Sequence, residues 1–177
     1  IHAAFERGLK MVLDCQVRQQ GVKTAWAQQH DNITLQPVKA RTFELPAITA
    51  NESCEILLFL MGIKNPSPEV VEAIHYGVKW LRQVQIKDVK LKRVPLAPDQ
   101  IINHEYPYDL VVVKDLKAEP IWARFYEVTN NKPFMCTRAG EKVWRLADVD
   151  PERRTGYDWY GYWPKKVFEA YAKFISR

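Results

Sequence analysis

The sequence has little cysteine and no long apolar run. Cys15, Cys54 and Cys136 are widely spaced and form no C-x-x-C pair, so the spacing does not support a zinc site, and an odd number of cysteines does not describe a disulfide framework. Cys15 and Cys54 lie in apolar helical patterns, where a free cysteine behaves as a small core residue. Since no apolar run approaches the roughly 20 residues of a membrane span, we expect no contact with a membrane.

Motifs of nucleic-acid-binding proteins are also absent. The formal net charge of +5 suits an acidic partner, which can be nucleic acid, anionic lipid or an acidic polysaccharide. However, Lys90–Arg93 is the only compact basic run, and 21 acidic residues are interspersed among the basic ones. Nucleic acid is therefore not an expected partner. Charge alone favours an ordinary solvated surface over a surface that binds an acidic polysaccharide.

The 177 residues suit one domain or a large piece of one, without repeats or an internal boundary. No secretory signal pattern opens the sequence, and Ile1 stands inside a helical pattern, so we expect further residues to precede it. Tryptophan and tyrosine are plentiful, and such rings serve either a core or a carbohydrate-binding surface.

Apolar residues with helical spacing predict four helices. Capping-box spacing starts the second helix, and a serine–proline pair starts the third. The expected ranges are 1–20, about 49–61, 68–85 and 164 onward. Gly21 is well placed to end the first helix, and the run Ile56–Met61 is apolar on all sides, so the second helix is expected to be buried.

The region between the third and fourth helices favours irregular structure with short strands. Pro95, Pro98 and Pro107 exclude a long helix in residues 87–119, where only Leu110–Val113 reads as a strand. Three alternating segments, 122–128, 134–138 and 142–146, then predict a small antiparallel meander with Trp122, Arg124 and Tyr126 on one side.

The segment Thr24–Pro46 concentrates polar chemistry without a helical period. A loop of this length between two helices is usually functional or disordered, and its apolar residues argue against disorder. We therefore expect an ordered loop that presents polar groups to a ligand. Within it, His30 and Asp31 are adjacent, but no activated serine or cysteine accompanies them, so a role for Asp31 in fixing the loop is favoured.

This loop also carries a family resemblance. Thr24–Pro46, Ala47–Ser53, Ile121–Val128 and Glu152–Pro164 (ERRTGYDWYGYWP) together resemble the pectate lyases of polysaccharide lyase family ten, in the family's order and at roughly its spacing. The family's catalytic domain is considerably longer, so residues 1–177 look like the C-terminal portion of a single catalytic domain. The resemblance implies a mainly α fold, an incomplete α/α toroid with long ordered loops and a few short antiparallel strands.

The resemblance further implies a secreted, monomeric enzyme that degrades plant cell walls by cleaving α-1,4-polygalacturonate (pectin) through calcium-dependent β-elimination. Such a reaction needs a base for the C5 proton and positive charge for the C6 carboxylate. Calcium prefers acidic oxygen ligands. Because Asp99, Asp109 and Asp115 are scattered, the metal ligands are expected mostly in the N-terminal part of the domain that this sequence lacks.

The base that the resemblance implies is Arg41. An arginine is normally charged, and making it neutral near pH 9 costs about 5 kcal/mol, so an alkaline optimum is expected. Neighbouring cations such as Lys39 reduce that cost. From the residues alone, an exposed loop arginine or an ion pair with Glu44 is the favoured role for Arg41, and the resemblance reverses that preference.

Three further residues are candidates for substrate binding: Lys39 and Arg124, which can pair with uronate carboxylates, and Tyr160, which can stack on sugar. Arg153 and Arg154 can also bind carboxylates, although one is expected to anchor acidic side chains of its own loop.

Two other functions stay open. The first is a non-catalytic module that binds acidic polysaccharide. The second is an α/α-toroid glycoside hydrolase, for which Glu44 and Glu127 are the candidate carboxylates.

Overall fold

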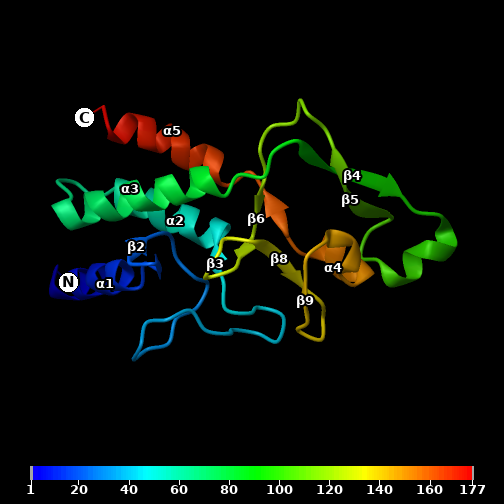
Figure 1. The fold of residues 1–177 in the computed structure, drawn as a ribbon, viewed down its shortest axis with the longest axis horizontal. Coiled ribbons are helices and arrows are strands. Elements are labelled where there is room, and N and C mark those ends of the chain that lie inside the picture. Colours follow the sequence, from blue (N-terminus) through cyan, green and yellow to red (C-terminus); the bar gives the residue numbers. More distant parts are fainter. Residues whose placement is uncertain (1, 177) are drawn as a thin grey trace.

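The computed structural model describes residues 2–176, with most helices gathered at one end and a long β-hairpin at the other (Figure 1). The α-helices are α1 (His2–Asp14), α2 (Ala50–Met61), α3 (Pro68–Gln83), α4 (Pro151–Gly156) and α5 (Pro164–Phe174). Helix α2 packs against both α3 and α5. Helix α4 stands apart from these, beside the hairpin (Figure 1).

Short antiparallel strands connect the two ends of the molecule. The central sheet has the order β3 (Ile48–Thr49), β7 (Phe125–Tyr126), β8 (Pro133–Cys136), β9 (Lys142–Val143). The smaller pairs are β1 (Arg18–Gln19) with β2 (Val22–Lys23), β6 (Trp122–Ala123) with β10 (Tyr160–Gly161), and β4 (Val89–Pro95) with β5 (Tyr108–Lys114). Two 3-10 helices, η1 (Pro98–Asn103) and η2 (Leu146–Asp148), complete the described elements.

The core has two apolar clusters that meet at the central sheet. One fills the space between the helices and includes the buried rings of Trp26, Trp80 and Trp122. The other lies under β7 and β8, where Phe125 stacks on Phe134 with ring centroids 5.8 Å apart. Alternation along β7 sends Phe125 to the second cluster and Tyr126 to the first, so the short sheet joins the helical end to the hairpin end.

The helix predictions are confirmed for α2, α3 and α5 and are wrong at the end of the first helix. Helix α1 ends at Asp14 instead of continuing to position 20, and Gly21 lies in a hairpin turn. Gln20 and Gly21 both have positive φ, as this turn requires. The buried amide of Gln16 donates to the carbonyls of Thr24 and Ala73, which fixes the chain after the helix. Ile1 lies outside the described residues.

The expectation that residues 87–119 are irregular is also wrong in part. Strands β4 and β5 pair over seven residues each, from Val89–Lys114 to Pro95–Tyr108. The prolines do not break this ladder because Pro95 ends β4 and Pro107 directly precedes β5.

The expected meander is present as β7–β8–β9, but Trp122 belongs to a different pairing, with β10. The chain within residues 2–176 is therefore mixed and mostly helical, with short antiparallel strands, which confirms the broader part of the predicted fold class. Within that same range, no helix has the length and apolar character to cross a membrane.

Candidate active site

The loop that follows β2 is held at its start by Trp26. This side chain is 1% exposed, and its indole nitrogen donates to the carbonyl of Val12 at 2.7 Å. The carbonyl of Trp26 accepts from the backbone of Thr49, just before α2, at 2.8 Å. Both ends of the loop are thereby tied to the helical core, and Phe43 and Leu45 near its end pack against the second cluster. The prediction of an ordered loop is confirmed.

His30 and Asp31 serve the loop itself. The Asp31 carboxylate accepts hydrogen bonds from the backbone of Ile33 and from the backbone and hydroxyl of Thr34, and these bonds lower the pKa of Asp31. The His30 ring accepts from the backbone of Ala27 through Nε2, while Nδ1 lies 2.9 Å from the carbonyl of Leu35. The loop-fixing role predicted for Asp31 is confirmed, and His30 shares it.

Arg41 and Glu44 form an ion pair within a tight turn. The Arg41 Nε donates to Glu44 Oε2 at 2.7 Å, and Arg41 Nη2 donates to Oε1. The backbone of Arg41 also donates to the same carboxylate, at 3.1 Å. Gln28 adds a bond at 3.2 Å, and Tyr157 hydroxyl lies 3.5 Å from Oε1. Glu44 is thus fixed from several sides and orients the Arg41 guanidinium.

Because of this pair, each group favours the charged form of the other. The hydrogen bond to Glu44 raises the pKa of Arg41, and the hydrogen bond from Arg41 lowers the pKa of Glu44. In the arrangement described, Arg41 is therefore a firmly charged cation. A role as a base requires the guanidinium to separate from Glu44.

Phe43 lies between the Arg41 turn and Arg153. The guanidinium carbon of Arg41 is 5.0 Å from the Phe43 ring centroid, and that of Arg153 is 3.9 Å from it. Arg153 is only 5% exposed and also contacts the rings of Tyr157 and Trp159. Its Nε and Nη2 have no hydrogen-bond partner among residues 2–176. Burial, and then the charge of Arg138, lowers the pKa of Arg153.

Arg124 joins the same cluster from the strand side. Its Nη2 donates to Glu52 of α2 at 2.5 Å, and its guanidinium carbon lies 4.9 Å from the Tyr157 ring centroid. Both members of the pair are mostly buried, with 16% and 24% of their side chains exposed. Arg124 and Arg153 therefore both contact the ring of Tyr157, and the charge of Arg41 also acts on this residue; burial raises the pKa of Tyr157 to about 12. We call Arg41, Phe43, Arg124, Arg153 and Tyr157, with the carboxylates of Glu44 and Glu52, the arginine cluster.

The other predicted site residues lie in different settings. Lys39 is exposed on the same loop and forms no ion pair within residues 2–176. Tyr160 is half-buried in β10, pairs with Ala123 and faces a pocket beside the hairpin. Arg154 is a structural clamp, since it holds Asp109 of β5 through two bonds of 2.8 Å. This acidic partner is on the hairpin, not on the arginine's own loop as expected.

Sequence reasoning missed Tyr157 and Glu52 as members of the cluster. The capping-box spacing that starts the second helix is that of Thr49 and Glu52, but Thr49 forms no side-chain capping bond and Glu52 pairs with Arg124 instead. Tyr157 stands inside the motif ERRTGYDWYGYWP among several other aromatic residues. Its three arginine neighbours, from three separate segments, supply the distinguishing signal, and only the fold brings them together.

The candidate carboxylate pair does not have the character of hydrolase residues. A general acid needs a raised pKa, whereas the pKa of Glu44 is lowered. Glu127 is engaged by Lys142, with a distance of 2.7 Å between the nitrogen and the carboxylate oxygen.

Residues 2–176 contain no group of three or more histidine, cysteine, aspartate or glutamate residues that can hold a metal ion. The residues described therefore do not by themselves fit a calcium site. Cys15, Cys54 and Cys136 are all free, and Cys54 is buried in the helical cluster as predicted.

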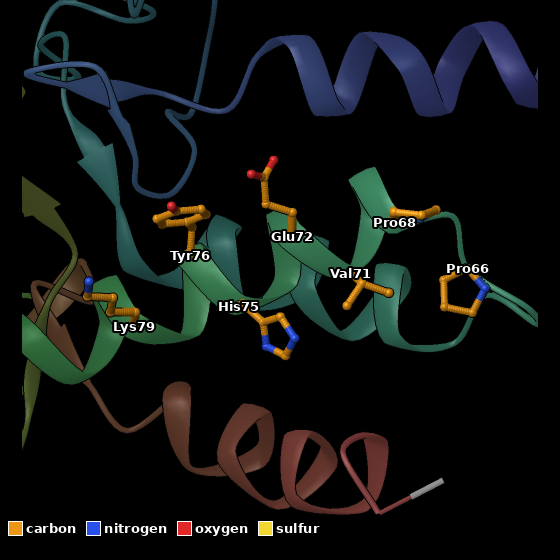
Figure 2. Close-up of a pocket in the computed structure, with 7 residues that line it drawn as sticks. All are labelled: Pro66, Pro68, Val71, Glu72, His75, Tyr76 and Lys79. Atoms are coloured by element: carbon orange, nitrogen blue, oxygen red, sulfur yellow. The ribbon is translucent and has the colours of Figure 1, made fainter.

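A separate groove of about 650 Å³ runs along α3, between α1 and α5 (Figure 2). Two of its polar side chains are already engaged, since Glu72 pairs with Lys23 at 2.6 Å and His75 bonds the Tyr171 hydroxyl at 2.6 Å. Figure 2 shows Glu72 and Tyr76 pointing toward α1 and His75 toward α5. The groove thus lies within the helical end, and it contains no residue of the arginine cluster.

The fold agrees with the comparisons to known proteins. Residues 1–168 match the sequence model of the pectic acid lyase family, and the chain belongs to that family. No curated protein matches the chain at a significant level.

Two similar solved structures are of a family 10 polysaccharide lyase from Cellvibrio cellulosa. One has a TM-score of 0.80 at 28% identity and covers 98% of this chain and 50% of the other. The second is an aspartate-to-alanine variant in complex with trigalacturonic acid, with a TM-score of 0.79, 28% identity, and coverage of 98% and 51%. The chain therefore spans about half the length of the lyase that it matches.

Proposed function

We propose that residues 1–177 are the C-terminal portion of a pectate lyase catalytic domain that cleaves α-1,4-polygalacturonate by β-elimination. Membership of the pectic acid lyase family supports this proposal, as does the similarity to a lyase crystallised with trigalacturonic acid. The helical end then corresponds to part of an α/α toroid. Secretion, a monomeric state and action on plant cell walls belong to the same proposal.

The observation that carries the proposal is the arginine cluster. A uronate presents a carboxylate on each sugar, and an arginine can bind a carboxylate through two parallel hydrogen bonds. Arg41 is 64% exposed on its side chain, so substrate can reach it, while Glu44 beneath it is 4% exposed and fixes its direction. Arg124 and Lys39 supply further positive charge for the carboxylates, and Tyr160 supplies an aromatic face.

In the proposed reaction Arg41 removes the C5 proton of the uronate. The electron pair of the C5–H bond forms the C4–C5 double bond, the C4–O bond breaks, and the leaving oxygen takes a proton from solvent water to become a hydroxyl, while Arg41 keeps the C5 proton. Arg41 must first separate from Glu44, since that carboxylate stabilises the charged guanidinium. Once it is separated, the charges of Arg153 and Lys39 favour its neutral form, because like charges disfavour one another.

Calcium belongs to the proposal through the family resemblance. When bound, it would supply positive charge for the C6 carboxylate. Since residues 2–176 offer no cluster of acidic or other ligands for it, we place its ligands mostly in the part of the lyase outside this chain.

One observation favours a second function, a non-catalytic module that binds acidic polysaccharide. The raised pKa of Arg41 suits a permanent cation, which binds a carboxylate better than it removes a proton. Such a module would bind polygalacturonate through the same arginines without forming product.

The test is an ultraviolet assay on polygalacturonate at alkaline pH, with calcium and with chelator. It is run on this chain and on a longer natural chain that includes the rest of the domain. The lyase proposal expects absorbance from the unsaturated product, lost with chelator. Binding without product by both chains supports the module, and product without the unsaturated end supports a hydrolase.

A further inference from the structure

A pocket separate from Arg41 lies where the β4–β5 hairpin meets α4 and β10. Its volume is about 430 Å³, within the range of about 300–1,000 Å³ for small-molecule sites. Its lining includes Arg93, Tyr106, Tyr108, Thr155, Tyr157 and Asp158. We call it the hairpin pocket.

The aromatic wall of the hairpin pocket is suited to a sugar ring. Tyr106 and Tyr108 stack on each other, with ring centroids 5.4 Å apart and an interplanar angle of 20°. Tyr106 is 41% exposed, so part of its surface is open to a ligand. Tyrosine offers both an apolar face and a hydroxyl, as a sugar with an apolar face and a polar rim requires.

One cation of the pocket is free to bind an anion. Arg93 is exposed and has no ion pair within residues 2–176, and its guanidinium carbon lies 4.8 Å from the Tyr108 ring centroid. Stacking on Tyr108 holds the guanidinium in place and leaves its edge available for a carboxylate. Arg154, by contrast, is occupied by Asp109 and by the carbonyl of Val149.

Other polar groups of the pocket suit hydroxyls. Asp158 is exposed and unpaired within the described chain, and its carboxylate accepts hydrogen bonds. The Thr155 hydroxyl has no hydrogen-bond partner among the described residues. With one free guanidinium and one free carboxylate, the pocket has little net charge. It therefore suits a sugar with a single carboxylate and disfavours a polyphosphate.

The pocket is preformed because the hairpin is clamped to α4. The Arg154–Asp109 pair links α4 to β5, with side chains only 14% and 18% exposed. Tyr157 then connects the pocket to the arginine cluster, since it lines the pocket and also contacts Arg124 and Glu44. A polymer that reaches Arg41 can therefore continue over Tyr157 toward the hairpin.

We propose that the hairpin pocket is a distal subsite that binds one uronate residue of the polysaccharide, with Arg93 on the carboxylate, Asp158 on a hydroxyl and Tyr106 against the ring. The proposal rests on the proposed function for the identity of the polymer. It adds a binding site at the hairpin end, away from the residues assigned to elimination.

The test is titration calorimetry of the 177-residue chain with polygalacturonate and with a fully methyl-esterified polymer, in chelator so that elimination does not consume the ligand. Arg93→Ala is expected to weaken binding of polygalacturonate about tenfold, as for the loss of one charged hydrogen bond. It is expected to leave binding of the ester unchanged, because the ester has no carboxylate. Tyr106→Ala is expected to weaken binding of both polymers.

Lys92→Ala is the matched control. Lys92 adjoins Arg93 on β4, so it lies on the opposite face of the hairpin, and it is exposed without an ion pair among residues 2–176. The Lys92→Ala substitution removes the same charge as Arg93→Ala and is expected to change affinity for polygalacturonate less than twofold at physiological salt. Circular dichroism of each variant confirms that the fold is retained.

Two results would overturn the proposal: equal weakening by Arg93→Ala and Lys92→Ala, or no weakening by Arg93→Ala. An equal effect of Arg93→Ala on the ester would also contradict it. Because binding is measured without turnover, these results are independent of elimination. A chain that forms no product can still show the Arg93 effect, in which case the lyase proposal fails and the subsite stands.

Discussion

The Glu44 carboxylate lies beneath the Arg41 guanidinium, with 4% of its side chain exposed against 64% for Arg41. The buried anion is the fixed partner, and the exposed cation is the one that can move. If Arg41 acts on a substrate, its guanidinium can therefore move away while Glu44 stays bonded to Gln28 and to the Arg41 backbone.

The first prediction concerns Glu44→Gln. The Glu44 charge raises the pKa of Arg41, so removing it lowers that pKa and makes the neutral guanidine available at lower pH. If Arg41 is the base, the rate rises as Arg41 loses its proton, so the rising part of the pH–rate profile moves to lower pH in the variant. The measurement is the initial rate of ultraviolet absorbance across the alkaline range. An unmoved limb in a folded variant would argue that Arg41 binds substrate without removing its proton.

A second prediction separates stability from activity at Arg153. Replacing a buried, unpaired charge by an apolar side chain of similar length is often neutral or stabilising. Arg153→Met is therefore expected to keep or raise the free energy of unfolding, by up to about 1–2 kcal/mol. The rising part of the pH–rate profile should move to higher pH, because the loss of a like charge near Arg41 raises the pKa of Arg41.

Urea unfolding and the pH–rate profile measure the two effects of Arg153→Met, and Arg153→Lys is the control that retains charge. A strongly destabilised methionine variant, or an identical profile for methionine and lysine, would contradict the role assigned to this arginine.

The third prediction addresses Arg124 and Glu52. Arg124→Met leaves the mostly buried Glu52 unpaired, so unfolding free energy should fall by about 2–3 kcal/mol. Adding Glu52→Gln removes the stranded charge and should recover most of that loss. The KM for polygalacturonate should stay raised, about tenfold, in both variants. Recovery of KM together with stability would show that Arg124 is only structural.

The fourth prediction is a pH dependence of stability at the hairpin clamp. Although burial raises the pKa of Asp109, hydrogen bonds from Arg154 and Leu110 lower it below its ordinary range. Its stabilisation is therefore present above the unfolded pKa, near 3.9, and is lost as pH falls through the lower folded pKa.

Asp109→Asn should accordingly reduce stability at neutral pH by about 1–3 kcal/mol and flatten the acid loss below about pH 4. Thermal unfolding midpoints from about pH 2.5 to 7 measure this pH dependence of stability, because that range spans the ordinary carboxyl pKa. Parallel curves of midpoint against pH for the variant and the parent would rule out the Arg154–Asp109 pair as the source of the stability loss at acid pH.

Local sequence patterns predicted the elements whose causes are local. The Ser67–Pro68 pair starts α3, with the Ser67 hydroxyl accepting from the backbone of Val70. Asp31 fixes its own turn through neighbours two and three residues away. In both cases the partner groups lie within four residues, so the spacing in the sequence specifies the contact.

Contacts between distant segments were not predictable in the same way. Strand β4 depends on pairing with β5, and its apolar–polar alternation extends only over residues 89–92. Helix α1 ends early because the hairpin of β1 and β2 turns the chain back toward the core. The arginine cluster gathers positions 41, 124 and 153, whose proximity depends on both apolar clusters being packed.

The role of Arg41 as the base is tested most directly by the ultraviolet assay on Arg41→Ala and Arg41→Lys, in a chain that includes the rest of the domain. Both variants should lose nearly all elimination while still binding polygalacturonate, because a lysine keeps the charge but not the arginine's geometry. Near-full activity of Arg41→Lys would contradict it and leave Arg41 as a cation that only binds the uronate carboxylate.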